Sequence, residues 1–287
     1  MRSDDDGLAG RRVLITGAAR GIGAATARRL HERGARPALL GLEPELLRQV
    51  SADCGDAPWW ECDVTDGDAV TRAVDAAAAE LGGLDVVMAN AGVAAQLPLI
   101  GGDPRVFERT MAVNVLGVYH TVRAAGPHIA HDRGYALLVS SLAAYVQLPL
   151  LGAYSASKAA VRALGETLRI ELRGSGARVG VAYFAEIDTD MTSRGFGTEA
   201  AGRLTALRGQ PGVAPLRVAI DAVERGIARR APRVVAPGWV RYALPARPAV
   251  QRVVAARLRP RVDEALRIAR TEDAPLTTEQ PPGGLRT

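Results

Sequence analysis

Tyr154 and Lys158 are the two side chains in this sequence best placed to move a proton. They stand four residues apart in the run Tyr-Ser-Ala-Ser-Lys, a spacing that puts both on one face of a helix. A nearby ammonium group favours the tyrosinate, so we expect Lys158 to lower the pKa of the phenol toward a value useful for acid–base chemistry. A Tyr–Lys pair on the surface with no function is the alternative interpretation.

Lys158 is also the only lysine of the chain. The 36 basic residues comprise 35 arginines and this one lysine. A bias toward arginine in this chain explains the 35 arginines, but it does not explain why position 158 is a lysine. Lysine is a compact charge whose pKa can shift, whereas arginine is a permanently charged fork. The exception therefore indicates a task that arginine cannot perform, unless the lysine survives by chance.

A second hydroxyl group comes from Ser141, which follows the apolar run 136–139 and precedes Tyr154 by 13 residues. The carboxyl ends of parallel strands are where ligands bind in an open α/β sheet. A strand end at Ser141 and a helix at Tyr154 could aim both hydroxyls into one crevice. A serine after a strand is also an ordinary turn residue.

A glycine-rich loop lies near the start of the chain, in the spacing Gly-x3-Gly-x-Gly. It contains Gly17, Arg20, Gly21, Ile22 and Gly23, directly after the apolar run 13–15. Glycines let the backbone approach a pyrophosphate, and a helix N-terminus supplies free N–H groups there. The sequence therefore predicts a dinucleotide site, with a plain glycine turn as the alternative.

Short apolar runs alternate with helical patterns through most of the chain, and these elements must position the side chains above. Strands are predicted over 13–15, 38–40, 59–63, 85–89, 136–139 and 179–183. Helices are predicted over about 21–33, 44–53, 66–81, 104–129 and 152–173. Continuous apolar strands separated by helices indicate a parallel sheet covered on both faces. We therefore predict an α/β fold with a single doubly wound, Rossmann-like sheet.

Composition narrows the class of protein further. With 287 residues, 48% of them hydrophobic and 23% charged, the chain is neither fibrous nor wholly disordered. It has no run of 18 apolar residues, and its acidic first residues do not resemble a secretory signal. Two cysteines and four histidines form no metal-ligand pattern, so no metal is expected. A cytoplasmic protein is the resulting expectation.

The net charge of +5 is unevenly distributed. Residues 201–270 hold 15 arginines and four acidic residues. Nucleic acid is disfavoured as a partner, because no aromatic residues alternate with these arginines. The stretch 249–270 is predicted to form a basic helix that either packs on its own core or on a neighbouring subunit, or lies on a membrane surface. Residues 272–287 are rich in Pro, Thr and Gly and are expected to be disordered.

Together these motifs make the chain resemble the short-chain dehydrogenase/reductase family over residues 8–235. Besides the glycine loop, Ser141, Tyr154 and Lys158, the matching residues are Asp63-Val64, Asn90-Ala91-Gly92, Asn114 and the segment Ile187-Asp188-Thr189. The resemblance implies a catalytic tetrad of Asn114, Ser141, Tyr154 and Lys158. It also implies that Asp63 and Val64 contact the adenine and that Thr189 contacts the carboxamide of a nicotinamide cofactor.

The resemblance implies hydride transfer between the nicotinamide and a carbon that bears oxygen. Tyr154 would exchange the proton of that oxygen, and Ser141 would polarise it. Lys158 would bind the nicotinamide ribose, and Asn114 would hold helix geometry and a water of the proton relay. One departure is Phe184-Ala185, where the family usually has Pro-Gly; this change could reshape the substrate side.

The choice between NAD and NADP depends on two opposing residues. The acid that usually ends the second strand and binds the 2′-hydroxyl of NAD is replaced by Gly41. Glu43 could substitute for it and would repel a 2′-phosphate. Arg20 in the glycine loop could instead favour NADP. We expect a weak preference for NAD.

The expected substrate is a small alcohol or ketone. Residues 190–215 would form a lid, and their apolar side chains favour a lipophilic molecule. Residues 236–287 would be a basic extension of the catalytic domain at 8–235, and a homodimer or homotetramer is expected. The alternatives are a dinucleotide-binding redox sensor without catalysis, which would not need Ser141, and a peripheral membrane reductase.

Overall fold

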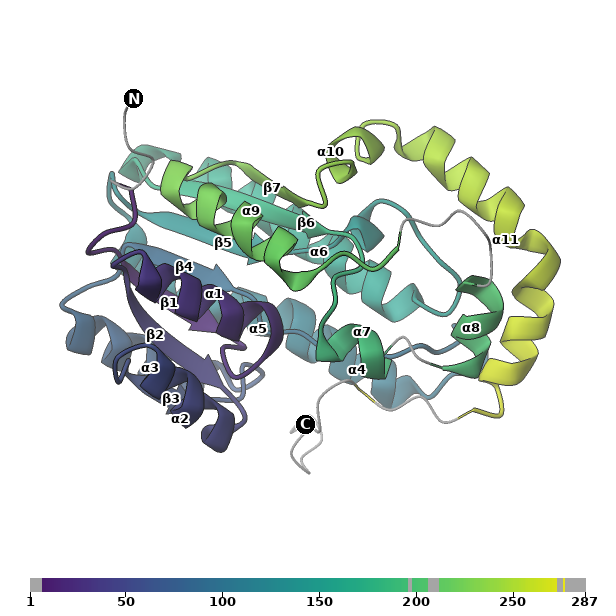
Figure 1. The fold of residues 1–287 in the computed structure, drawn as a ribbon, viewed down its shortest axis with the longest axis horizontal. Coiled ribbons are helices and arrows are strands. Elements are labelled where there is room, and N and C mark those ends of the chain that lie inside the picture. Colours follow the sequence, from purple (N-terminus) through teal and green to yellow (C-terminus); the bar gives the residue numbers. More distant parts are fainter. Residues whose placement is uncertain (1–6, 196–197, 206–211, 273–275, 277–287) are drawn as a thin grey trace.

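In the computed structural model, a parallel β-sheet runs through the centre of the protein (Figure 1). The structure describes residues 7–195, 198–205, 212–272 and 276. The described residues form seven strands in the order β3-β2-β1-β4-β5-β6-β7, each parallel to its neighbours. The strands are β1 Arg12–Thr16, β2 Arg36–Gly41, β3 Trp59–Glu61, β4 Val86–Ala89, β5 Tyr135–Val139, β6 Arg178–Phe184 and β7 Arg233–Ala236.

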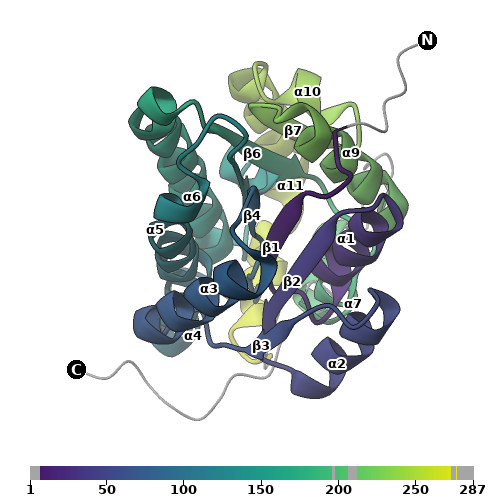
Figure 2. The same ribbon diagram turned by 90° about the vertical axis from the view of Figure 1, so that its left-hand side faces the viewer.

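Helices cover both faces of this sheet, as Figure 2 shows. The main helices are α1 Gly21–Glu32, α2 Pro44–Asp53, α3 Gly67–Leu81, α4 Pro104–Met111, α5 Gly117–Ile129, α6 Gly152–Glu171 and α9 Leu216–Arg229. Helices α1, α2 and α9 pack on one face, and α3, α5 and α6 pack on the other. The predicted doubly wound α/β fold is therefore confirmed.

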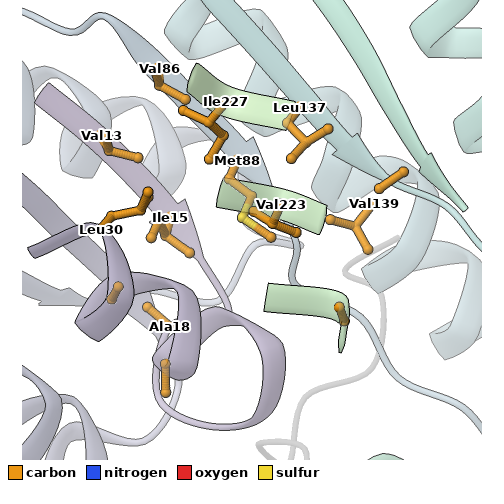
Figure 3. Packing of buried hydrophobic residues seen from close by; sticks show 14 of the residues in the cluster. Val13, Ile15, Ala18, Leu30, Val86, Met88, Leu137, Val139, Val223 and Ile227 are labelled. Carbon is orange, nitrogen blue, oxygen red and sulfur yellow. The ribbon is translucent and has the colours of Figure 1, made fainter. Parts of the chain in front are cut away.

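The central strands are apolar on both faces because both faces are buried. All residues of β4 and β5 are buried, as are the last four of β1. Figure 3 shows one of the two layers, in which Ile15, Met88 and Leu137 of neighbouring strands meet Leu30 of α1 and Val223 of α9. A single apolar side chain of this size contributes about 1.5–3 kcal/mol when fully buried.

The helical prediction over 104–129 is interrupted in the structure. Helix α4 ends at Met111, a π-helical turn spans Ala112–Leu116, and α5 begins at Gly117. Such turns are often found at functional sites, and this one carries Asn114. Helix α9 and strand β7 were not individually predicted, because a four-residue strand after an arginine-rich helix has a weak apolar signal.

The strand order reverses between β1 and β4. The chain moves outward from β1 to β2 and β3, then crosses back to add β4 to β7 on the other side. The connections on the two sides diverge at this point and leave a crevice beyond the carboxyl ends of the strands, where doubly wound proteins bind ligands. The glycine loop follows β1 and Asn90 follows β4, so both lie at this reversal.

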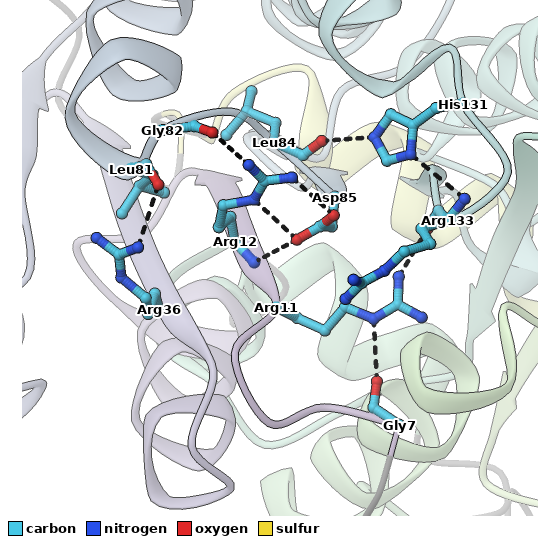
Figure 4. A network of polar contacts seen from close by, with 10 residues as sticks. All are labelled: Gly7, Arg11, Arg12, Arg36, Leu81, Gly82, Leu84, Asp85, His131 and Arg133. Carbon is cyan, nitrogen blue, oxygen red and sulfur yellow. Dashed lines mark hydrogen bonds and ion pairs between the residues drawn. The ribbon is translucent and has the colours of Figure 1, made fainter.

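Arginines at the opposite end of the sheet have structural contacts (Figure 4). Arg12 forms an ion pair with the buried Asp85, with 2.9 Å between Nη2 and Oδ1. Arg36 Nη1 donates to the carbonyl of Leu81, at the C-terminus of α3, at 3.1 Å. The hydrogen bonds from Arg12 hold the pKa of Asp85 at about 2, although burial of the carboxyl opposes that shift.

The last part of the described chain adds helices at the carboxyl end of the sheet. These are α7 Asp190–Gly195, α8 Glu199–Thr205, α10 Val240–Ala243 and α11 Arg247–Ala269. Figure 1 shows α11 lying beside α8, and Leu258 and Ala265 of α11 are buried against Ala200 and Leu204 of α8. The part of α11 around Leu258 and Ala265 is thus covered by α8.

Two expectations fall partly outside the described residues. The lid predicted over 190–215 contains α7 and α8, but 196–197 and 206–211 are not described. The disorder expected over 272–287 concerns residues that, except for 272 and 276, also lie outside the description. No helix in the described ranges is long and apolar enough to cross a membrane.

Candidate active site

A cavity of about 520 Å³ opens at the carboxyl ends of the strands. Its wall includes Gly17 and Gly21 of the glycine loop, the side chains of Ser141, Tyr154 and Lys158, and residues of α11. The residues predicted to bind a dinucleotide and those predicted to carry out chemistry therefore line one continuous space. The cavity also reaches Glu43, Asp63, Val64, Asn90, Ala91, Gly92, Ile187 and Thr189.

The glycine loop depends on its glycines for conformation and for space. Gly17 and Gly21 have φ of +65° and +55°, in the left-handed region that favours glycine. A Cβ at Gly23 would lie 2.1 Å from the carbonyl oxygen of Gly17, so α1 could not start in this position with a larger residue. Asn90 Nδ2 donates to the carbonyl oxygens of Thr16 and Gly17 at 3.0 and 3.2 Å and fixes the loop from β4.

The N-terminus of α1 is suited to an anion. No side chain caps it, so the first amides of α1 have no side-chain acceptor. Such free N–H groups, together with the positive end of the helix dipole, bind phosphate groups. Around Gly21, the nearest atom to an added Cβ is 3.9 Å away, on Thr189, so the approach to these amides is open. The residues present therefore fit the pyrophosphate of a dinucleotide.

Tyr154 and Lys158 occupy the first two turns of α6 and are buried. Lys158 Nζ lies 5.5 Å from the centre of the Tyr154 ring and donates to the carbonyl of Val139 at 3.0 Å. The predicted helical pairing of the two side chains is thus observed. Ser140 Oγ donates to the carbonyl of Lys158 at 2.8 Å and ties α6 to the end of β5.

Burial controls the protonation of this pair. It raises the pKa of Tyr154 to about 12, and a hydrogen bond with Ser141 lowers it only in part. Burial also lowers the pKa of Lys158 to about 8. The expected net decrease in the pKa of the phenol is therefore not found in the protein without ligands, because burial disfavours the tyrosinate.

Ser141 joins β5 to the cavity wall. Its Oγ donates to the carbonyl of Phe184 at 3.3 Å and accepts from the amide of Ala143 at 3.1 Å. The second bond caps the short 3₁₀ turn Leu142–Ala144. The hydroxyl is therefore held between β6 and this turn, and it also contacts Tyr154.

Asn114 in the π-helical turn is fully buried and braces the site from behind. Its Oδ1 accepts from the amide of Val93 at 2.8 Å, and its Nδ2 donates to the carbonyl of Val93 and to Ser157 Oγ. A Cβ on Gly92 would lie 3.2 Å from Asn114 Oδ1 and 3.4 Å from Lys158 Nζ. A side chain at position 92 would therefore contact both Asn114 and Lys158.

Glu43 and Arg20, the two residues expected to oppose each other in cofactor choice, bind each other. Arg20 forms an ion pair with Glu43 and lies 3.4 Å from Asp190 of α7. The side chains of Arg20 and Glu43 are 27% and 24% exposed, and both line the cavity. The charge of each side chain is therefore partly neutralised by the other.

Asp63 and Val64, which the family resemblance places at the adenine, line the cavity. Asp63 accepts from Thr65 Oγ1 at 2.8 Å and from Arg109 Nη2 at 2.9 Å. Hydrogen bonds from Thr65 and Arg109 lower the pKa of Asp63 against the effect of burial. Arg109 of α4 had not been singled out, because a contact across 46 residues leaves no local sequence signal.

The segment after β6 completes the wall. Ile187 is buried, and Thr189 Oγ1 donates to its carbonyl at 3.3 Å. Phe184 and Ala185, the departures from the usual Pro-Gly, continue the regular end of β6, where the amide of Ala185 donates to the carbonyl of Ala236 of β7. Glu186 was missed by sequence reasoning; it lines the cavity, and burial raises the pKa of its carboxyl.

The larger omission was α11. Val250, Val253, Val254, Arg257 and Leu258 all line the cavity. Their spacing on one helix face was visible in the sequence, but not the fact that this face looks into the site. Among the described residues, no group of histidine, cysteine or acidic side chains could hold a metal ion.

Comparison with known proteins gives a consistent result. The family model for short chain dehydrogenases matches residues 11–200. An uncharacterised oxidoreductase of Mycobacterium tuberculosis is 33% identical over 202 residues, which are 67% of this chain but only 59% of that protein. The cis-4-hydroxycyclohexanecarboxylate dehydrogenase of Sinomonas cyclohexanicum is 37% identical over 212 residues, covering 72% of this chain and 84% of the relative.

A similar solved structure is a short chain dehydrogenase from Burkholderia cenocepacia in complex with NADP. It is 29% identical, with a TM-score of 0.72, and the match covers 88% of this chain and 98% of the other. The similarity therefore extends beyond the part of the chain that the family model matches.

Proposed function

The chain belongs to the short-chain dehydrogenase family, and we propose that it transfers hydride between NAD or NADP and a secondary alcohol or ketone. The observation that carries this proposal is the single cavity shared by the open N-terminus of α1 and by Ser141, Tyr154 and Lys158. A redox sensor without catalysis would need the open N-terminus of α1 to bind the dinucleotide, but not Ser141, Tyr154 and Lys158. The burial of a phenol and an ammonium together would destabilise a protein that made no use of them.

The bound nicotinamide supplies the hydride acceptor or donor. The protein residues hold the oxygen of the substrate and move its proton. In ketone reduction, the Tyr154 hydroxyl donates its proton to the carbonyl oxygen as negative charge develops there. Ser141 Oγ, held between β6 and the 3₁₀ turn, would turn the proton that it now donates to the carbonyl of Phe184 toward the same oxygen and so provide a second hydrogen bond. Two positioned donors stabilise the charge that forms in the transition state.

Lys158 and Asn114 support this proton transfer. The ammonium group of Lys158 lies beside the Tyr154 ring and stabilises the phenolate left after donation. Asn114 and Gly92 fix the space behind Lys158, so the ammonium group keeps its place. A pKa of about 12 for Tyr154 means that the protein without ligands holds the protonated phenol, which is the form required for carbonyl reduction.

For the cofactor, we propose that Glu43 favours NAD by holding Arg20. A free Arg20 could pair with a 2′-phosphate, but here its guanidinium group binds the carboxylate of Glu43. Glu43 would also repel that phosphate directly. The NADP seen in the Burkholderia structure belongs to that protein, and the two residues here leave room for both dinucleotides.

The substrate part of the proposal rests on the cavity wall and on one relative. Beyond Tyr154 the wall is mainly apolar, with Val250 and Val254 of α11, Leu204 of α8 and Trp239. This favours a lipophilic molecule. The Sinomonas relative is named for a hydroxycyclohexane compound, which is a secondary alcohol. Helix α11 of the basic extension then belongs to the catalytic unit, because its residues line the cavity.

The test is a screen of secondary alcohols and ketones with both nicotinamide cofactors, followed by the absorbance of the reduced nicotinamide. We expect turnover of apolar cyclic or medium-chain compounds. Tight dinucleotide binding without turnover of any of these compounds would favour the redox sensor and contradict the proposal.

A further inference from the structure

The α11 side of the cavity contains a positive charge in an otherwise apolar wall. Arg257 lines the cavity together with Val253, Val254 and Leu258. Within the described ranges, no carboxylate or carbonyl group pairs with the Arg257 guanidinium group. The other arginine in the cavity wall, Arg20, forms an ion pair with Glu43.

Arg261 lies one helical turn beyond Arg257 on the same face of α11. Its Nη1 atom is buried and has no hydrogen-bond partner in the described part of the chain. A buried guanidinium nitrogen without an acceptor costs about 1–3 kcal/mol or more. Arg257 in the cavity wall and, one turn further along α11, the buried Nη1 atom of Arg261 therefore both lack an acceptor in the described part of the chain.

Arg257 and the reacting groups lie on different walls. Tyr154 and Ser141 belong to α6 and to the end of β5, whereas Arg257 belongs to α11, which Figure 1 shows at the outer side of the molecule beside α8. The cavity carboxyl without an ion pair in the described residues, Glu186, follows β6 near Ser141. An anionic group would thus be attracted to the guanidinium group on α11.

We propose that the substrate is a secondary alcohol or ketone that carries an anionic group, a carboxylate or its equivalent, and that Arg257 binds this group. The proposal rests on the proposed function and adds the substrate class. The apolar wall contacts the carbon skeleton, and Tyr154 binds the alcohol oxygen. The guanidinium group of Arg257 donates hydrogen bonds to the anion, and Arg261 lies one turn further along α11. This fixes the substrate at both ends and orients its reacting carbon.

The test uses medium-chain hydroxy acids with the secondary alcohol next to the terminal methyl group, and their methyl esters. Dissociation constants are measured by calorimetry and kcat/KM by absorbance, for the wild type, Arg257→Ala and Arg252→Ala. Arg252 is an exposed arginine of α11 that does not line the cavity, so its variant removes the same charge from the same helix. Arg257 is itself exposed, so its truncation leaves no buried void.

We expect the wild type to bind the acid about tenfold more tightly than the ester, the lower end of what a charged hydrogen bond contributes, because Arg257 is partly solvated. Arg257→Ala should abolish this preference and leave the ester unchanged, whereas Arg252→Ala should keep it. Equal binding of acid and ester by the wild type, or an equal loss in both arginine variants, would overturn the proposal. Preferential binding of the acid without any turnover would support the anion site and contradict the proposed activity instead.

Discussion

Replacing Glu43 by glutamine tests how the protein distinguishes the two dinucleotides. The substitution keeps the size of the side chain and removes the charge that holds Arg20. Arg20 then becomes available to a 2′-phosphate, and the repulsion between Glu43 and that phosphate disappears. A charge-assisted hydrogen bond contributes about 1.5–3 kcal/mol. Since both side chains are about one quarter exposed, solvent screening places the effect at the lower end, about tenfold in kcat/KM for NADP.

The assay compares kcat/KM for NAD and NADP in the wild type, in Glu43→Gln and in Glu45→Gln. Glu45 lies two residues away on α2, is exposed and pairs with Arg48, so it removes the same charge outside the cavity. We expect the ratio of NADP to NAD efficiency to rise about tenfold in Glu43→Gln only. A wild-type preference for NADP that the substitution leaves unchanged would refute the reasoning and show that Arg20 governs the choice despite its ion pair.

Three further predictions follow from the same geometry. Lys158→Arg should lower kcat/KM by about 10²-fold or more, because a forked guanidinium group cannot occupy the place of the ammonium between Gly92 and the Tyr154 ring; normal kinetics would contradict this. Gly92→Ala should lower kcat/KM while the midpoint of urea unfolding changes little, since the added methyl group lies only 3.2 Å from Asn114 Oδ1 and also contacts Lys158 Nζ at 3.4 Å. Asp85→Asn should remove about 2 kcal/mol at neutral pH, because the pKa of Asp85 is held at about 2 instead of 3.8. This stability is present above about pH 4 and is lost as the pH falls toward 2, so wild type and variant should converge in urea unfolding at low pH.

Local patterns predicted those parts of the site that depend on neighbouring residues. The glycine loop, the four-residue spacing of Tyr154 and Lys158 and the helix at 44–53 are each set within one turn or one element. Long-range contacts were not predictable in this way. The pairing of Asp63 with Arg109 and the closing of the cavity by α11 depend on elements that meet only in the folded protein.

The pKa of Tyr154 illustrates the same limit. The sequence showed an ammonium group one turn away, which predicts a lower pKa. It did not show that both side chains are buried, and burial raises the pKa of the phenol instead. The sign of the shift was decided by desolvation, a property of the whole cavity.

The most direct test of the central claim is hydride transfer by Tyr154→Phe. Phenylalanine keeps the packing of the ring beside Lys158 and removes only the hydroxyl group that exchanges the proton. Dinucleotide binding is measured by calorimetry and turnover by the absorbance of the reduced nicotinamide, on a substrate accepted by the wild type. The account predicts unchanged dinucleotide binding and a loss of about 10²–10⁴-fold in kcat. Turnover within a few-fold of the wild type would contradict the assignment of Tyr154 as the general acid–base.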